Sequence, residues 1–198
     1  MSRPPHLVVA SASPRRHELL TSLGLAFTVE PSDVDETLDP GPLAAAVAAL
    51  ALRKARAVAG RRRHGIVLGA DTIVVIDGEA LGKPSGRAEA VAMLRRLRGR
   101  THEVMTGVAL VDAATGRHAA ETVTSRVSMR AYSEAEIAHY VATGEPLDKA
   151  GAYAIQGVGG ALVAGLEGSR SNVVGLPLEA TAALLRRFGV AVSAPAAD

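Results

Sequence analysis

The sequence predicts an α/β fold with a mixed sheet. Short apolar runs typical of strands alternate with alanine-rich or amphipathic segments typical of helices, and glycine or proline usually separates them. Two long strand-like segments, 104–112 and 121–130, lie on either side of a turn around Thr115 and Gly116. A central antiparallel hairpin among alternating strands and helices indicates a sheet of mixed direction.

Length and composition limit the class of protein. With 198 residues, 48% of them hydrophobic, the chain can form a substantial core. We expect one domain over residues 1–192 and a disordered tail over 193–198. There are no cysteines, which excludes disulfides and thiolate zinc sites, and no apolar run reaches the roughly 18 residues that span a bilayer. Residues 1–10 lack the features of a signal peptide, so we expect a cytoplasmic protein that does not bind membranes.

Local signals define the elements of the first half. Ser13 is a favourable N-cap and Pro14 suits the first position of a helix that stops at Gly24. An acidic segment with three prolines is expected to be a loop, and Gly60 closes the alanine-rich helix that follows it. The expected elements are a strand over 7–10, a helix over 14–23, a strand over 25–29, a loop over 31–42 and a helix over 43–59.

The second half is punctuated in the same way. Asp77 and Gly78 form a hairpin turn after a long apolar strand, and Ser85 is expected to cap the next helix. Ser133 and Glu136 have the spacing of a capping box. The expected elements are a strand over 66–76, a helix over 85–98, the central hairpin, a helix over 133–141, an irregular segment over 148–160, a strand over 161–166 and a helix over 178–188.

Charge and composition argue against a general nucleic-acid binder. The net charge is only +2 and aromatic residues make up 3% of the chain, so stacking partners are scarce. Among the 22 basic residues only three are lysine, namely Lys54, Lys83 and Lys149. Because arginine is the usual cation here, each lysine suggests a specific use of a compact point charge, such as contact with a phosphate or carboxylate.

A phosphate-binding site is predicted where the first strand meets the first helix. The N-terminus of a helix offers free N–H groups and partial positive charge. Arg15 and Arg16 lie in the first turn, where cations oppose the helix dipole. Their position is favourable if an anion binds there, as phosphates do at such termini. Two solvent-facing arginines are the alternative.

A second candidate is Asp71, a carboxylate within the apolar strand 66–76. Side chains alternate along a strand, so Asp71 faces away from the apolar Ala70, and it needs a cation, metal or water as partner. The hairpin turn can return Lys83 toward it along an adjacent strand. An aspartate at a strand edge paired with arginine is the alternative.

The acidic loop 31–42 supplies a second carboxylate for a magnesium or manganese site with Asp71. Glu36 is favoured, although little separates it from Asp35, and the loop acids are otherwise simply solvated. The six histidines show no spacing typical of a metal site.

Six segments in fixed order resemble the Maf family of nucleotide pyrophosphatases. Together they extend from about Leu7 to Leu185, and the ordered set is far more specific than any one segment. The segments are ASASPRRHELLTSLG, PSDVDE, LGADTIVVIDGEALGKP, THEVMTGVALV, EPLDKAGAYAIQG and GSRSNVVGLPL. The resemblance implies an elongated, mixed, curved sheet flanked by helices, with two lobes and a central cleft, similar to inosine-triphosphate pyrophosphatases.

The resemblance also implies roles for single residues. Asp71 matches the family's catalytic proton acceptor and, with Glu36, would hold a divalent metal. The expected substrate-binding residues are Ser11, Arg15, Arg16, Lys54, Thr72, Lys83 and Gln156. Two of the three lysines and the only glutamine of the chain fall on these positions.

The expected activity is hydrolysis of dTTP and UTP, and of modified pyrimidine nucleotides, to monophosphate and pyrophosphate. The segment AGAYAIQG resembles the dTTP/UTP branch, and a 7-methyl-GTP pyrophosphatase is the alternative within the family. A regulatory binding protein in cell division and a nucleic-acid-binding protein are alternatives from other classes. The expected partner is a nucleoside triphosphate, and a homodimer remains open.

Overall fold

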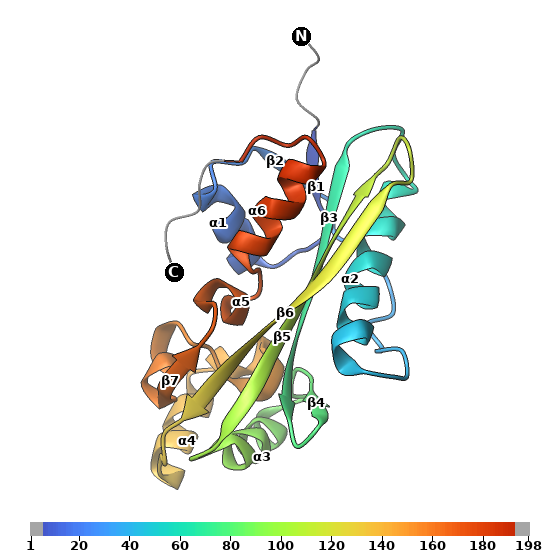
Figure 1. Cartoon of the computed structure of the whole chain (residues 1–198). Helices are drawn as coiled ribbons and strands as arrows, with labels where there is room; N and C mark the ends of the chain where they lie inside the picture. Colours follow the sequence, from blue (N-terminus) through green and yellow to red (C-terminus); the bar gives the residue numbers. More distant parts are fainter. Residues whose placement is uncertain (1–5, 193–198) are drawn as a thin grey trace. The chain divides into compact units, whose positions relative to one another are not determined.

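The structure is a computed structural model that describes residues 6–192 (Figure 1). Its strands are β1 (Leu7–Val9), β2 (Phe27–Val29), β3 (Ile66–Ile76), β4 (Glu79–Leu81), β5 (Thr101–Asp112), β6 (His118–Met129) and β7 (Val163–Glu167). Its α-helices are α1 (Pro14–Ser22), α2 (Leu43–Ala59), α3 (Arg87–Leu97), α4 (Glu134–Ala142), α5 (Arg170–Val174) and α6 (Leu178–Arg187). Three short 3₁₀ turns follow α4, namely Glu145–Asp148, Ala150–Ala152 and Gly157–Leu162.

The strands form one seven-stranded mixed sheet, which confirms the predicted α/β class. The order is β2-β1-β3-β5-β6-β7, and β4 pairs with β3 outside this path. β1 is parallel to both β2 and β3, whereas β4 on β3 and β7 on β6 are antiparallel. The long strands β5 and β6 form the expected central hairpin (Figure 1).

The chain forms two compact units. The first unit comprises Met1–Asp71, Thr106–Val123 and Gly175–Asp198, and the second comprises Thr72–Met105 and Thr124–Val174. The single domain over 1–192 stays a prediction, and the tail expected over 193–198 lies outside the described residues.

In the first unit, the two faces of β1 and β3 are covered by different helices. Alternate residues of β3, Ile66, Leu68 and Ala70, share a core cluster with side chains of α1 and α6. Val67 lies in a different cluster with Ala55 and neighbouring residues of α2. This period of two places α2 against the face of β3 that carries residues 67, 69 and 71.

Two glycines allow α2 to approach the sheet closely. A Cβ atom at Gly69 of β3 would overlap the carbonyl oxygen of Ala51 and lie 2.8 Å from the Ala55 nitrogen. A Cβ atom at Gly107 of β5 would overlap the carbonyl oxygen of Val47. The helix backbone therefore occupies the space of missing side chains, and the small residues of α2 make this contact possible.

The second unit has its own core. Leu94 and Leu97 of α3, Ile137 of α4 and Val104 of β5 are almost fully buried in one cluster. The capping box at the start of α4 is present as predicted: the Ser133 hydroxyl and the Glu136 carboxylate each bond the other residue's backbone N–H.

Several predicted boundaries match the structure and some are wrong. The bounds of α2 and β3 agree with the expected ranges. The prediction that Ser85 caps the next helix is wrong, because α3 begins at Arg87 and Ser85 instead donates its N–H and hydroxyl to Glu89. Helix α5 was not anticipated, since five residues are too short to show a helical period.

Replacing Gly69 with alanine should destabilise the protein by about 2 kcal/mol or more, because the added methyl group pushes α2 away from β3. Urea unfolding of G69A against wild type measures this. The matched control is G82A, since no heavy atom lies within 4 Å of a Cβ built at Gly82. Equal stability of G69A and G82A would contradict this view of the packing.

Candidate active site

The junction between β1 and α1 holds an arginine in a fixed position. Arg16 donates from Nε to the carbonyl oxygen of Gly175 at 2.8 Å and from Nη1 to Ser11 Oγ at 3.1 Å. Ser11 is 8% exposed, and its carbonyl oxygen lies 2.7 Å from His17 Nε2. Ser13 occupies the N-cap position and Pro14 the first helical position, as predicted, although the Ser13 side chain makes no cap hydrogen bond.

Several charged side chains act on Arg16 at this junction. The pKa of Arg16 is lowered, chiefly because burial penalises its charged form. The Asp71 carboxylate raises that pKa, Arg15 lowers it and Glu36 raises it. Arginine remains protonated under these influences. Arg15, Asp71 and Glu36 therefore all act electrostatically on Arg16. Phosphate binding by Arg15 and Arg16 stays a prediction.

Lys54 joins the two predicted carboxylates. Its Nζ atom donates to Asp71 Oδ1 at 2.6 Å and to Glu36 Oε1 at 2.7 Å. The side chains of Lys54, Asp71 and Glu36 are 7%, 15% and 60% exposed, respectively. A buried ammonium group is unfavourable unless it is paired, so the two carboxylates stabilise Lys54 in this position.

The sequence pattern explains why Lys54 meets Asp71. Lys54 belongs to the buried stripe of α2, together with Val47, Leu50 and Val58, which follow the helical period. Asp71 lies on the face of β3 that also carries Gly69, against which α2 packs. The close approach at Gly69 thus brings the lysine and the aspartate within hydrogen-bonding distance.

Arg53, the neighbour of Lys54, holds the loop that carries Glu36. It donates to the carbonyl oxygens of Asp35 at 3.1 Å and Thr37 at 2.6 Å, and it pairs with Asp39 Oδ1 at 3.1 Å. Because Asp35 and Thr37 flank Glu36, these bonds fix the backbone on both sides of it. Arg53 therefore positions Glu36 beside Lys54.

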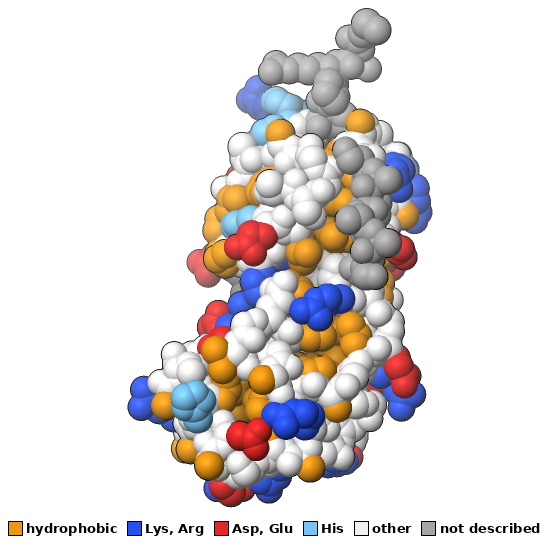
Figure 2. Space-filling view, turned by 90° about the vertical axis from the view of Figure 1, so that its left-hand side faces the viewer, with side chains coloured by type: hydrophobic (Ala, Val, Ile, Leu, Met, Phe, Trp, Pro, Cys, Tyr) orange, Lys and Arg blue, Asp and Glu red, His pale blue; other side chains and the backbone are white. Residues whose placement is uncertain are grey.

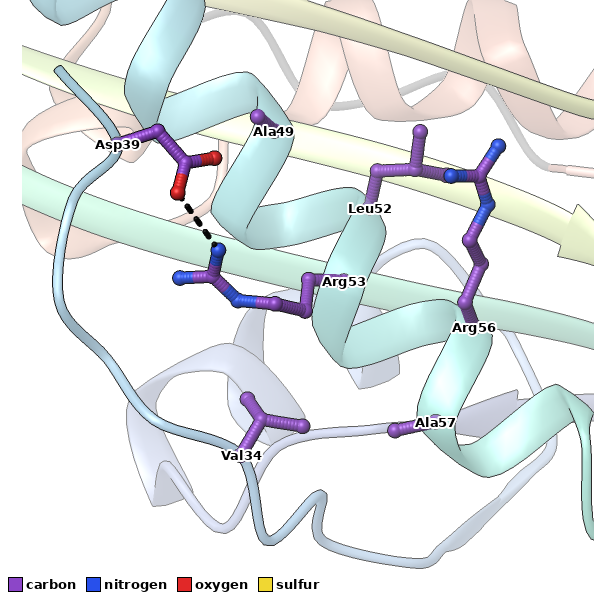
Figure 3. Close-up of a pocket in the computed structure, with 7 residues that line it drawn as sticks. All are labelled: Val34, Asp39, Ala49, Leu52, Arg53, Arg56 and Ala57. Atoms are coloured by element: carbon purple, nitrogen blue, oxygen red, sulfur yellow. Dashed lines mark hydrogen bonds and ion pairs between the residues drawn. The ribbon is translucent and has the colours of Figure 1, made fainter.

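A hollow of about 560 Å³ lies where this loop runs along α2 (Figure 3). Neither Lys54 nor Asp71 lines it, so the hollow belongs to the outer face of the helix. Its lining residues are Val34, Asp39, Ala49, Leu52, Arg53, Arg56 and Ala57.

Glu36 and Asp35 have different partners, which shows which of the two acids lies with Asp71. Glu36 contacts Lys54, whereas Asp35 accepts bonds from the backbone N–H and the hydroxyl of Thr37 through Oδ1. Those bonds lower the pKa of Asp35, the hydroxyl bond most. Glu36 is thus the acid that lies with Asp71.

The other expected site residues lie in the second unit. Thr72 follows Asp71 on β3 and is partly buried, whereas Lys83 and Gln156 are exposed. β4 pairs Val74 with Leu81 and ends there, two residues before Lys83.

Three contacts at the first-unit site have no counterpart among the sequence predictions. They are the bonds of Arg53 to the loop around Glu36, the bond of Arg16 to the carbonyl oxygen of Gly175, and the bond of the His17 ring to the carbonyl oxygen of Ser11. All three involve backbone carbonyl groups, which no residue type reveals. His17 is one of six histidines without a telling spacing, so its bond to Ser11 could not be anticipated.

Two carboxylates are a donor set of the kind that holds magnesium together with phosphate oxygens. Magnesium is commonly held by one or two carboxylates together with substrate phosphates. Asp71 and Glu36 supply two such carboxylates, but Lys54 already binds one oxygen of each. Residues 6–192 contain no group of three or more His, Cys, Asp or Glu side chains that could hold a metal ion.

Charges of both signs lie on one face of the described residues. On the face shown in Figure 2, basic and acidic side chains of the described residues are interspersed, without a continuous basic stripe. This agrees with the net charge of +2.

Comparison with known proteins assigns the family. The model of the family described as "Maf-like protein" matches residues 6–188. The chain belongs to the Maf family. A relative from Moorella thermoacetica, named dTTP/UTP pyrophosphatase, is 56% identical over 187 residues, covering 94% of this chain and 96% of the relative. A relative of the same name from Myxococcus xanthus is 58% identical over 186 residues, covering 93% of each chain.

This membership confirms the resemblance on which the sequence predictions drew. A further relative with that name, from Pelotomaculum thermopropionicum, is 52% identical and covers 92% of this Maf chain. Within the described residues, no helix combines the length and hydrophobicity needed to cross a membrane.

Replacing Lys54 with methionine should lower the free energy of unfolding by about 3 kcal/mol, because two carboxylates then lie together without their shared cation. Denaturant unfolding measures the loss. Combining K54M with D71N should recover part of it, since one of the two charges is then also removed. E36Q alone, at a largely exposed residue, should change stability by less than about 1 kcal/mol. Additive losses in the double variant would contradict direct pairing.

Proposed function

We propose that this Maf protein is a nucleoside-triphosphate pyrophosphatase that converts dTTP and UTP to the monophosphate and pyrophosphate. The observation that carries the proposal is the group in the first unit in which Lys54 joins Asp71 to Glu36 while Arg16 interacts electrostatically with both carboxylates. The names of relatives that are 52–58% identical over nearly the whole chain support the substrate choice.

In this proposal, Arg15 and Arg16 bind the phosphate chain. Their guanidinium groups offer planar, bidentate donors for phosphate oxygens. Arg16 is held by Ser11 and by the carbonyl oxygen of Gly175, so its charge is oriented before the substrate arrives. Such preorganised cations stabilise the charge that develops on the leaving pyrophosphate.

Asp71 acts as the general base. Lys54 donates to its Oδ1 atom and so holds the carboxylate that takes the proton of a water molecule. The water oxygen bonds to the α-phosphorus as the bond from that phosphorus to the bridging α–β oxygen breaks, and pyrophosphate leaves with the electron pair. Lys54 keeps the carboxylate in one orientation throughout, which contributes through positioning.

Asp71 and Glu36 are the residues that would hold a magnesium or manganese ion. When bound, such an ion neutralises phosphate charge and lowers the pKa of a water molecule. Lys83 is proposed as a further contact to the phosphates. Thr72 and Gln156 are proposed to influence base choice, since the Gln156 amide can both donate to and accept from the imide edge of uracil or thymine.

Replacing Asp71 with asparagine should reduce turnover of dTTP by about a thousandfold or more, because an amide cannot accept the proton. Release of pyrophosphate measures turnover, and calorimetric titration with dTTP should show that binding persists. D77N, in the exposed turn after β3, is the matched control and should remain active. Turnover of D71N within a few-fold of wild type would exclude Asp71 as the base.

A panel of triphosphates tests the substrate choice. We expect pyrophosphate release from dTTP and UTP to exceed that from GTP and 7-methyl-GTP, and to require magnesium or manganese and stop with a chelator. Preference for 7-methyl-GTP would overturn the proposed substrate. The cytoplasmic location and the oligomeric state remain predictions.

A further inference from the structure

Gln156 lies on a loop whose backbone is held from both sides by one pair of side chains in the second unit. Tyr140 Oη accepts a bond from the N–H of Ala154 at 3.1 Å, two residues before Gln156. The Glu145 carboxylate accepts bonds from the N–H groups of Val158 at 3.1 Å and Gly159 at 3.0 Å, just after it. Tyr140 Oη in turn donates to Glu145 Oε1 at 2.9 Å.

Packing and hydrogen bonds hold both members of the pair in place. Tyr140 belongs to α4, is 1% exposed and packs in the core cluster of the second unit. The backbone of Glu145 is held at both ends, since its N–H donates to Thr143 Oγ1 at 3.1 Å and its carbonyl oxygen accepts from Lys149 Nζ at 2.7 Å. Burial, followed by the bond to Glu145, raises the pKa of Tyr140, so the phenol remains a donor at neutral pH.

The loop itself is shaped to fit around the pair. Gly157 adopts φ +68°, and a Cβ atom there would lie 2.8 Å from Glu145 Oε2. A Cβ atom at Gly159 would overlap Tyr140 Oη. Both glycines are thus required for the loop to close on the two side chains. Gln156, by contrast, is exposed, so its amide is presented to solvent from a fixed backbone.

We propose that the Tyr140–Glu145 pair positions Gln156 and thereby sets the selectivity of the enzyme for the base of its substrate. The inference rests on the proposed function, in which Gln156 contacts the base. An amide discriminates better between imide and amino edges when the backbone that carries it is fixed, because a moving backbone lets the amide reach either edge. Neither Tyr140 nor Glu145 needs to touch the substrate, so both are positioning residues.

The test compares dTTP with dCTP, which share a sugar and differ at the edge that an amide would contact. In E145Q the amide group replaces one acceptor oxygen with a donor facing a backbone N–H group. The ratio of kcat/KM for dTTP to that for dCTP should fall about tenfold, mainly through a higher KM for dTTP. Y140F, which removes only the hydroxyl, should lower the ratio in the same direction.

Two further variants separate positioning from a general structural effect. In a Q156A background, E145Q should not change the ratio further, since the residue through which Glu145 acts is gone. E136Q is the matched control: Glu136 also accepts a backbone N–H bond, from Ser133, and lies in the same unit. It should leave the ratio unchanged.

Hydrogen exchange provides a readout independent of activity. The amides of Val158 and Gly159 should exchange faster in E145Q than in wild type, and equally in E136Q and wild type. Should E145Q fail to fold, Y140F carries the same comparison with a smaller perturbation, and its Ala154 amide should exchange faster.

The outcomes distinguish this inference from the function on which it rests. A wild-type enzyme that hydrolyses dTTP, together with folded E145Q and Y140F variants that keep its dTTP to dCTP ratio, would overturn the inference alone. Wild-type protein that hydrolyses no triphosphate would overturn the proposed function and this inference with it.

Discussion

The pairing of Lys54 with Asp71 and Glu36 is the constraint on which the candidate site depends. A lysine on the buried stripe of α2 is unfavourable without partners. The close approach of α2 over Gly69 accompanies its bond to Asp71. Packing and electrostatics therefore reinforce one another in the first unit. The arrangement fixes the carboxylate that the proposed chemistry uses, and Arg53 fixes the loop that brings Glu36 to the same ammonium group.

In the second unit, hydrogen bonds rather than an ion pair hold the backbone around Gln156. Its contacts run from side chains to backbone N–H groups, with Tyr140 and Glu145 as the acceptors. The exposed glutamine is left to meet a ligand. In the proposed function, Gln156 of the second unit influences which base is accepted.

Much of the fold follows from the sequence, because glycine and proline mark where elements end. The bounds of α2 and β3 agree with prediction since Gly60 and the Asp77–Gly78 turn close them. Site contacts that involve backbone atoms could not be predicted in the same way. The sequence of the acidic loop does not distinguish Asp35 from Glu36. The structure does, because Glu36 accepts a bond from Lys54 whereas Asp35 accepts its bonds from Thr37. The role inferred for Glu145 depends likewise on which N–H groups its carboxylate reaches.

The central claim is that the carboxylate held by Lys54 faces the phosphorus at which water attacks. A crystal structure of the protein with magnesium and the non-hydrolysable analogue α,β-imido-dTTP tests it most directly. The account predicts the α-phosphate beside Asp71 and the remaining phosphates against Arg15 and Arg16. A triphosphate bound without contact to Asp71 or to these arginines would contradict it.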